Sequence, residues 1–492
     1  MRRYQAVIIG AGFGGICMAV KLKAAGINDF IILEQASGLG GTWRDNIYPG
    51  AECDIPSSLY SFSFALNSHW KFKWSEQSQI LQYQKDTAEK YGVTHHIRYN
   101  QRVESLSFDE KSAHWNIQVN GAQPIIAQHS ISAVGQLHVP AIPTLAGQQA
   151  FGGDTFHSAR WRQDVDLTNK RVAVIGNAAS AVQFIPQIAE QCAQLTIFQR
   201  SPNWMLPKVD RLYRGWEQWL SDKVPALAKL YRFLVWAYGE WLILPAIKGN
   251  RVAAWIVKTM CRWNLNKYIK DPELRQQLTP DYPIGAKRIL FCDDYYPVLN
   301  LPNVSLESNA IDQLTTSGLR TGDGREHSFD VVIYATGFVT NPFLSEIDVI
   351  GIGGQTLSDA WAEGAHAYLG VATHGFPNLH FLYGPNTNLG HSSIIIMLEA
   401  QADYIVQAIN HASANGVALD IDATVEQTFD EEVQARLQRL AWHKIDASWY
   451  KVGERIPNNW AGSTWEYRRR LRRFDADRYQ RISPVSISAA ES

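Results

Sequence analysis

The pattern of apolar and polar positions near the start of the chain defines two kinds of segment, which alternate. The runs QAVIIG (5–10) and FIILE (30–34) are short, apolar and rich in β-branched residues. Between them, MAVKLKAAG (18–26) places apolar residues at helical spacing among lysines. Short β-branched runs are typical of buried strands, and the mixed spacing is typical of a helix. The pattern predicts a strand–helix–strand unit.

The same order returns further along the chain. RVAVIG (171–176) and LTIFQR (195–200) have the strand pattern and enclose NAASAVQFIPQIAEQ (177–191), which has the helix pattern. A further apolar run, FDVVIYATGF (329–338), ends in a turn of small residues and predicts a strand that returns the chain to the first unit. Because strands that alternate with helices form parallel sheets, we expect an α/β fold with two such domains.

The first strand runs into a glycine-rich loop, GAGFGG (10–15). Gly10, Gly12 and Gly15 fit G-x-G-x-x-G, in which the glycines allow a tight turn, close approach to a pyrophosphate and close packing of helix on strand. The unpaired N–H groups of the helix N-terminus then face the phosphates. Glu34, at the end of the next strand, is placed to accept hydrogen bonds from a ribose. The pattern predicts a Rossmann-like dinucleotide-binding domain; the alternative is a glycine-rich turn without a ligand.

The second loop differs from this pattern in two ways. Gly176 is the first glycine of the motif, and Ala178 and Ala181 stand in place of the second and third. Ala178 puts a methyl group where a pyrophosphate comes close, so we expect weaker binding or a shifted pose. Arg200 stands at the strand end in place of an acid, which suits a ribose 2′-phosphate and favours NADPH over NADH. The alternative for Arg200 is a solvated side chain at a strand end.

The composition narrows the classes of protein. The 492 residues carry a formal net charge of −1, which argues against a nucleic-acid-binding protein. The five cysteines form no C-x-x-C pair, which excludes a dithiol of the thioredoxin-reductase type. The sequence shows neither an apolar leader nor a long uncharged apolar stretch. We expect a cytoplasmic protein.

One further stretch, FGGDTFHSARW (151–161), carries aromatic residues where a plain linker would be polar. It resembles the fingerprint F-x-G-x-x-x-H-x-x-x-W of type I Baeyer–Villiger monooxygenases, with Phe151, Gly153, His157 and Trp161 in register. The related flavin-containing monooxygenases, which oxidise amines and sulfides, usually carry another aromatic residue at the last position. Arg162 departs from the Pro or Asp that commonly follows in the family.

Other stretches carry the same resemblance along essentially the whole chain, closest to 4-hydroxyacetophenone monooxygenase-like members. GGTWRDNIYPGAECD (40–54) is similar to the family's G-G-x-W-x-x-x-x-Y-P-G-x-x-x-D, and YPIGAKRILFCDDYYPVLN (282–300) to the segment with its active-site Lys-Arg pair, here Lys287 and Arg288. GPNTNLGHSS (384–393) and SWYKVGERIPNNWAG (448–462) resemble a flavin-side loop and a C-terminal loop over NADP.

The resemblance implies an FAD- and NADPH-dependent enzyme that converts ketones into esters or lactones with O₂, through a C4a-peroxyflavin. Arg288 would stabilise the peroxide and the adduct, Asp54 would hold Arg288, and His157 and Trp161 would anchor the moving linker. The residues expected to contact the cofactors are Gly10, Gly12, Phe13, Gly14, Gly15, Glu34, Gly41, Thr42, Trp43, Asp54, Tyr60, Val103, Gly176, Asn177, Ala178, Ser180, Arg200, Ser201, Lys287, Arg288 and Trp449. No metal is expected.

Three alternatives remain open from the sequence. Asp54 and Arg288 could form a structural ion pair, and His157 and Trp161 could be packing residues of a hinge. The same fold also serves flavin-containing monooxygenases that oxygenate nitrogen or sulfur, against which Arg288 and Trp161 argue. The third alternative is a flavin-binding protein without catalytic activity.

The segment 209–279 reads as a helical insertion, because LYRFLVWAYGEWLILPAI (230–247) and AAWIVKTMCRWNLNKYI (253–269) are aromatic and aliphatic at helical spacing. By resemblance it lines the substrate entrance, which suggests an apolar aryl or long-chain ketone. Helices packed on their own core are the alternative, and contact with a membrane surface is another. The remaining boundaries are an FAD-binding domain at 1–140 and 375–492, an NADP-binding domain at 147–208 and 280–340, and linkers at 141–162 and 341–374.

Overall fold

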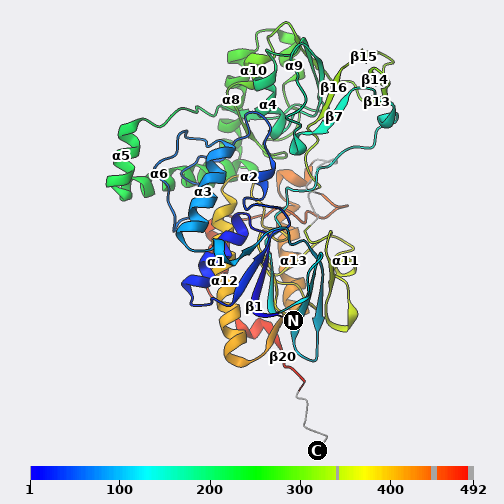
Figure 1. The fold of residues 1–492 in the computed structure, drawn as a ribbon. Helices are drawn as coiled ribbons and strands as arrows, with labels where there is room; N and C mark the ends of the chain where they lie inside the picture. Colours follow the sequence, from blue (N-terminus) through cyan, green and yellow to red (C-terminus); the bar gives the residue numbers. More distant parts are fainter. Residues whose placement is uncertain (1, 340–342, 445–450, 486–492) are drawn as a thin grey trace, which may run out of the picture.

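The computed structural model describes residues 2–339, 343–444 and 451–485. It has the predicted α/β class, with two separate sheets of mainly parallel strands. Figure 1 shows the second sheet and its helices at one end of an elongated molecule and the first sheet at the other. No helix among the described residues is long and apolar enough to cross a membrane.

The first sheet has eight strands in the order β17-β4-β5-β6-β1-β2-β3, with β18 also paired to β6. Their bounds are β1 Arg2–Ile9, β2 Phe30–Leu33, β3 Ile97–Arg98, β4 Val103–Asp109, β5 His114–Val119, β6 Ile125–Ser132, β17 Asp348–Ile350 and β18 Leu379–Phe381. The predicted strands at both sides of the first glycine loop, β1 and β2, pair in parallel. The side chains of residues 6–9 in β1 and of all of β2 are buried on both faces, as their continuous apolar runs require.

Helices cover this sheet and complete the first domain. They are α1 Phe13–Ala24, α2 Thr42–Asp45, α3 Gln77–Lys90, α11 Leu357–Ala360, α12 Ile394–Asn415, α13 Ala423–Leu437 and α14 Thr464–Arg470. α1 packs on the long helix α12 in the largest hydrophobic core, where Ile16 and Ile405 are fully buried. A short pair, β19 Ala418–Ile421 and β20 Tyr479–Ile482, ties the end of the chain to this domain.

The second sheet is parallel throughout, in the order β12-β9-β8-β16-β7. Its strands are β7 Asp154–His157, β8 Arg171–Ile175, β9 Gln194–Phe198, β12 Val304–Glu307 and β16 Val331–Tyr334. The helices of this domain are α4 Ala179–Ile188, α9 Pro272–Gln277 and α10 Tyr295–Val298. Smaller sheets join β10 Met205–Leu206 with β11 Leu290–Phe291, and β13 Ile311–Thr315 with β14 Gly318–Thr321 and β15 Glu326–Ser328.

The helical insertion is helical over both segments with helical spacing, 230–247 and all but the last residue of 253–269, and contains further helices outside them. Its helices are α5 Gly215–Lys223, α6 Pro225–Tyr238, a π-helical turn Gly239–Ile243, α7 Leu244–Ile247 and α8 Arg251–Tyr268. α5 lies out to the side of the molecule, away from both sheets (green in Figure 1).

The structure differs from the expected linkers at two strands. β7 falls inside the segment 141–162, which overlaps the expected NADP-binding domain 147–208, and it is the edge strand of the second sheet, paired with β16. β17 falls inside 341–374 and pairs with β4 of the first sheet. The two crossings between the domains also pair with each other, through the bridge Pro140–Phe338. Sheet pairing therefore holds part of each segment that was expected to be a linker.

The fingerprint around His157 is explained largely by this packing. A side chain at Gly153 would overlap the carbonyl oxygen of Asp330 and the ring of Phe151. Trp161 packs its ring 5.2 Å from that of Phe184 on α4. The ring of Phe184 in turn lies 6.1 Å from Tyr48, a residue of the second fingerprint. The two fingerprints therefore meet on α4, which is why both carry aromatic residues at fixed spacing.

Hydrogen bonds on the same helix join the two domains. The amide of Gln183 on α4 donates to the carbonyl of Glu52 over 3.0 Å, and its oxygen accepts from the hydroxyl of Tyr48 over 2.8 Å. Gly50 has a positive φ of 73°, and a side chain there would lie 2.6 Å from the carbonyl oxygen of Gln183. Only glycine allows this close approach of the loop 48–54 to the helix.

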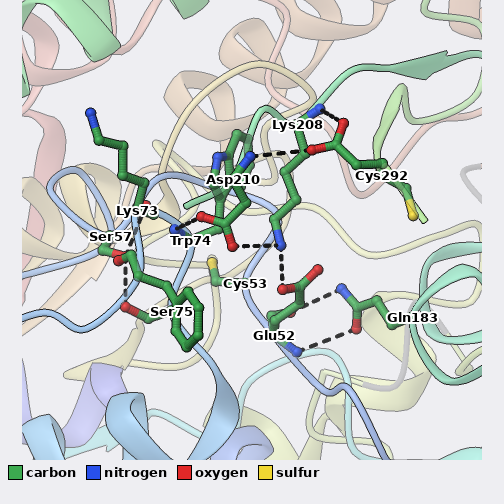
Figure 2. Close-up of polar contacts among 12 residues, drawn as sticks. Glu52, Cys53, Ser57, Lys73, Trp74, Ser75, Gln183, Lys208, Asp210 and Cys292 are labelled. Atoms are coloured by element: carbon green, nitrogen blue, oxygen red, sulfur yellow. Dashed lines mark hydrogen bonds and ion pairs between the residues drawn. The ribbon is translucent and has the colours of Figure 1, made fainter. Parts of the chain in front are cut away.

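An ion cluster reinforces the interface beside Gln183. Figure 2 shows the ammonium group of Lys208, which follows β10, between the carboxylates of Glu52 and Asp210. The Lys208 side chain is only 7% exposed. Burial disfavours its charge, but Glu52 and Asp210 outweigh burial and raise the pKa of Lys208. Burial raises the pKa of the Glu52 carboxyl to about 7, although Lys208 acts in the opposite direction.

We predict that Gly153→Ala destabilises the protein by roughly 1–3 kcal/mol, because the new methyl group must displace backbone and a packed ring. Thermal unfolding followed by circular dichroism measures the effect. Gly215→Ala is the matched control, since a side chain there meets nothing within 4 Å. Equal melting temperatures for the two variants would contradict the packing role of Gly153.

A second prediction concerns the pH dependence of the interface. The carboxyl of Glu52 has an ordinary pKa of 4.5 and a folded pKa of about 7. Between these values folding takes up a proton, so the stability that this group contributes falls as the pH rises. The melting temperature of Glu52→Gln, relative to the parent, should therefore increase from about pH 5 to about pH 8.

Glu104→Gln, at an exposed position of β4, is the control and should show no such trend. A difference between Glu52→Gln and the parent that stays constant over this range would show that Glu52 does not titrate there.

Candidate active site

One large cavity, of about 1090 Å³, lies where both glycine loops face the interface between the domains. The predicted residues that line it are Gly10, Gly12, Phe13, Gly14, Glu34, Gly41, Thr42, Trp43, Asp54, Tyr60, Val103, Gly176, Asn177, Ala178, Ser180, Arg200, Ser201, Lys287 and Arg288. The fold brings them together because both loops follow the carboxyl ends of central parallel strands, where ligands of open α/β sheets bind.

The two glycine loops have nearly the same backbone geometry. Gly10 and Gly176 have φ of 105° and 108°, which favour glycine. Gly12 and Ala178, one step before α1 and α4, have φ of −84° and −85° with ψ of −163° and −162°. Alanine adopts these negative angles without strain. The substitution at Ala178 therefore leaves the loop intact, and its methyl group matters only for what approaches the loop.

The carboxylate of Glu34 fixes the backbone of the first loop by hydrogen bonds. Its two carboxylate oxygens accept hydrogen bonds from the backbone N–H of Ala11 and of Ala36, each over 2.9 Å. The guanidinium of Arg44 pairs with the same carboxylate at 3.1 Å. A carboxylate offers about four acceptor sites, so Glu34 retains capacity for a ribose hydroxyl. Arg44 is not among the residues predicted from the sequence, although it lies next to Trp43 inside the second fingerprint.

Aromatic side chains form one wall beside this loop. The indole N–H of Trp43 donates to the hydroxyl of Tyr60 over 3.0 Å. The ring of Phe13, at the start of α1, lies 5.2 Å from that of Tyr60 in an edge-on arrangement. Burial raises the pKa of Tyr60 well above its ordinary value, so the phenol stays neutral. This wall is rigid and apolar, as suits a flat ring system.

Arg288 and Asp54 form an ion pair at the cavity, with 2.6 Å between nitrogen Nη2 and oxygen Oδ2. The pair crosses the domain interface, because Asp54 is the last residue of the loop 48–54 and Arg288 precedes β11. The two side chains are 31% and 21% exposed, so they are partly withdrawn from solvent but still open to the cavity. A guanidinium in a partly dry site is a strong fixed positive charge.

The adjacent Lys287 faces a different part of the cavity. Its ammonium group donates to the hydroxyl of Ser201 and lies 4.8 Å from the ring centre of Tyr282. Burial, and then the neighbouring charge of Arg200, lower the pKa of Lys287. Arg200 and Lys287 thus form a pair of cations at the end of β9, while Arg288 lies against Asp54.

Three of the predicted site residues are not part of the cavity wall that the structure describes. Gly15 lies inside α1, where its lack of a side chain lets the helix pack on the carbonyl of Gly10. Trp449 lies outside the described residues. His157 ends β7, opposite Tyr334 of β16, and is only 2% exposed.

The environment of His157 is that of a structural side chain. Its nitrogen Nδ1 accepts a hydrogen bond from the backbone N–H of Ala159 over 3.0 Å. Its ring lies 6.1 Å from Phe338, in the crossing between the domains. Burial lowers the pKa of His157 to about 4, against the backbone of Gly337, which raises it. His157 is therefore neutral near pH 7 and acts on the crossing rather than on the cavity.

The cavity has two further walls, and the second includes part of the loop 384–393 that the resemblance places beside the flavin. One is the segment 133–138, which follows β6; another contains Tyr383, Asn388 and Leu389, from the region after β18. The hydroxyl of Tyr383 donates to the side-chain oxygen of Asn388 over 2.7 Å, and burial raises the pKa of Tyr383 to about 12. The first wall could have been found from the apolar run before Gly135, because that strand ends beside the first glycine loop.

None of the described residues that line the cavity comes from the helical insertion 209–279, which the resemblance places at the substrate entrance. The lining residues pass from Asn203 directly to Lys287. Many of the aromatic side chains of the insertion, such as Trp219 and Trp241, are exposed instead. Their number therefore gives no information about the polarity of a ligand in the cavity.

Comparison with known proteins agrees with this geometry. Residues 7–216 match the family described as pyridine nucleotide-disulphide oxidoreductase. A Baeyer–Villiger monooxygenase of Streptomyces coelicolor is 40% identical over 99% of this chain and 95% of its own. One of Pseudomonas aeruginosa is 39% identical over 97% of this chain and 91% of its own.

Solved structures of similar proteins cover the chain nearly completely. OTEMO in complex with FAD and NADP is 28% identical, with a TM-score of 0.85 over 97% of this chain and 99% of its own. Cyclohexanone monooxygenase in its closed form is 27% identical, with a TM-score of 0.86 over 98% and 100%. With its two glycine loops, its cavity and these relatives, the chain belongs to the Baeyer–Villiger monooxygenases, flavoproteins that work with FAD and NADP(H).

Proposed function

We propose that this enzyme inserts one oxygen atom of O₂ beside the carbonyl group of an apolar ketone and so forms an ester or lactone. NADPH supplies two electrons, and the second oxygen atom leaves as water. The observation that carries the proposal is the ion pair of Arg288 and Asp54, which faces the cavity between the two nucleotide loops. Apolar side chains in the same lining, among them Ile55, Leu389 and Ile394, support an apolar ketone.

The residues of the first domain fit FAD. We assign the pyrophosphate to the loop Gly10–Gly14 and the N-terminus of α1, and the adenosine ribose to Glu34. The apolar wall of Trp43 and Tyr60, continuous with Phe13, suits the isoalloxazine ring. When bound, FAD takes up hydride from NADPH and activates O₂ for transfer to the substrate.

The residues of the second domain fit NADPH. Gly176, Asn177 and Ser180 lie around the N-terminus of α4, where a pyrophosphate binds. We assign the 2′-phosphate to Arg200 and Lys287, assisted by Ser201. Burial is the main cause of the lowered pKa of Lys287, and the charge of Arg200 adds to it; two cations this close to each other favour an anion between them.

Arg288 is the residue that we assign to the chemical step. Oxygen insertion builds negative charge on oxygen before the carbon–carbon bond migrates. A fixed guanidinium stabilises that charge without reorganising solvent. Asp54 is a positioning residue, because it orients the guanidinium and offsets its desolvation. His157 is a positioning residue for the crossing between the domains.

The reaction class is tested with purified holoenzyme, NADPH, isotopically labelled O₂ and a panel of ketones and sulfides, with products identified by mass spectrometry. We expect esters or lactones that contain one labelled oxygen atom. Sulfoxides as the only products would show a heteroatom-oxygenating enzyme and overturn the proposal.

We predict that Arg288→Ala abolishes ester formation while part of the NADPH oxidation survives and ends in hydrogen peroxide. Loss of one charged stabilising contact typically lowers kcat by roughly a hundredfold to a thousandfold. Asp54→Asn should act in the same direction but more weakly, since it only orients the guanidinium. Product analysis and a peroxide assay measure the two outcomes separately.

The control for these variants is Arg162→Ala, whose guanidinium pairs with Asp154 and Asp164 on the surface. It should leave the ester yield unchanged. Ester formation by Arg288→Ala at the parent rate would show that Arg288 is not the stabilising cation.

We predict that Arg200→Ala raises the KM for NADPH about tenfold to a hundredfold, because it removes a charge-assisted contact worth roughly 1.5–3 kcal/mol. The KM for NADH, which lacks the 2′-phosphate, is the internal control and should not change. Steady-state oxidation of the two cofactors gives both values. Equal loss with NADPH and NADH would place Arg200 away from the 2′-phosphate.

A further inference from the structure

The helix α6 has its apolar side turned outward. Leu227, Leu230, Leu234 and Tyr238 follow one another at helical spacing, and Trp241 in the π-helical turn continues the row. These five side chains, the outward stripe, are between 38 and 68% exposed. Among the residues of α6 only Ala237 is buried. An amphipathic helix of a globular domain normally turns such a stripe to the core.

On the opposite side of α6 and of the π-helical turn, polar side chains fix this orientation by hydrogen bonds to the rest of the enzyme. The guanidinium of Arg232 points inward and donates to the carbonyl of Ser58 over 2.7 Å. The indole N–H of Trp236 donates to the hydroxyl of Thr464 over 2.8 Å. The buried carboxylate of Glu240 accepts from the backbone N–H of Thr464 over 2.9 Å. Polar side chains therefore hold the helix on the enzyme, and its leucines face away.

The helices that pack on α6 and on the π-helical turn also carry exposed apolar side chains. Trp216 and Trp219 of α5 are 59 and 62% exposed, and α5 packs on α6. Val252 and Trp255, in the first turns of α8, are 67 and 68% exposed, and α8 packs on the π-helical turn. An exposed apolar area of this extent is unusual on a free surface.

The same part of the chain is strongly basic. Residues 211–270 contain eleven Lys and Arg but only three Asp and Glu, whereas the whole chain has a net charge of −1. Three exposed cations belong to these helices: Lys223 ends α5, Lys229 is on α6 and Arg251 begins α8. Within the ranges that the structure describes, none of these three makes a side-chain hydrogen bond or ion pair. They are available for anions from another body.

We propose that the outward stripe, with Trp216, Trp219, Val252, Trp255 and these three cations, binds the surface of an anionic lipid bilayer. Trp and Leu side chains enter the boundary between headgroups and acyl chains, while Lys and Arg pair with lipid phosphates. α6 lies in the plane of the surface and does not cross it. This binding is independent of the oxygenation reaction.

The charge distribution favours lipid over a second copy of the chain as the occupant. A two-fold contact would place the same basic surface against itself, and like charges at close range repel. An anionic bilayer supplies both the counter-charge and the apolar interior. Trp is also the side chain most typical of such interfaces, because its ring is apolar and its N–H finds a polar partner.

The test is co-sedimentation of the flavin-loaded enzyme with vesicles. We expect binding to vesicles of phosphatidylglycerol and phosphatidylcholine in equal parts, and little binding to phosphatidylcholine alone. At about 1 M salt, where the Debye length is about 3 Å, binding to the mixed vesicles should fall strongly. Absence of binding to mixed vesicles at low salt would overturn the proposal.

Two triple variants separate the contributions. Lys223→Gln/Lys229→Gln/Arg251→Gln should lower the partition coefficient roughly a hundredfold, since each cation near the surface contributes about fivefold to tenfold. Trp216→Ala/Trp219→Ala/Trp241→Ala should lower it about tenfold or more. The matched control Lys85→Gln/Lys111→Gln/Lys170→Gln removes three exposed charges elsewhere and should bind like the parent. Flavin absorbance and lipid-free ester formation verify that each variant is folded.

Several results would contradict the proposal. Parent-like binding by the Trp variant would show that these Trp side chains do not enter the bilayer. Parent-like binding by the charge variant would show that these cations do not bind lipid phosphates. A third result would be that the parent does not bind vesicles but forms a dimer in mass photometry, and that only the Trp variant is monomeric. It would show that a second copy of the chain covers the surface.

Discussion

The central constraint on this structure is the ion pair of Arg288 and Asp54, which places a positive charge at the cavity between the two domains. Arg288 belongs to one side of the interface and Asp54 to the other, so the ion pair exists only while the domains are in contact. Other contacts make this arrangement stable. Gln183 fastens the loop 48–54 to α4, and Lys208 is buried against Glu52. The partly dry surroundings that make a guanidinium effective are thus created by the interface itself.

The two glycine loops show how much of a binding site can be repeated within one chain. Gly12 and Ala178 have almost identical backbone angles although one carries a side chain. The strand–loop–helix geometry sets these angles, and the negative φ makes them available to any residue. Chemical differences between the sites come from the ends of the following strands, where Glu34 and Arg200 stand. The same backbone geometry therefore occurs twice, with side chains of opposite charge at the ends of the following strands.

The helical insertion follows a different rule from the rest of the molecule. In both sheet domains the continuous apolar runs are buried, as expected. In α6 the apolar stripe is exposed, and Arg232 and Glu240 make the contacts with the enzyme body. Hydrogen bonds can hold a helix in this orientation because they satisfy the buried polar groups, even though they leave leucines in water. The exposed apolar area then requires a partner of its own.

The sequence by itself determined the parts of this protein that depend on local chemistry. Strands, helices, both glycine loops, the acid at Glu34 and the cation at Arg200 could be placed from short-range patterns, and the family resemblance placed Asp54 and Arg288. Only the tertiary structure decided which face of α6 is exposed, that His157 is buried away from the cavity, and that the neighbours Lys287 and Arg288 separate. Periodicity defines an apolar side of a helix but not what that side meets, because burial is set by residues distant in the chain.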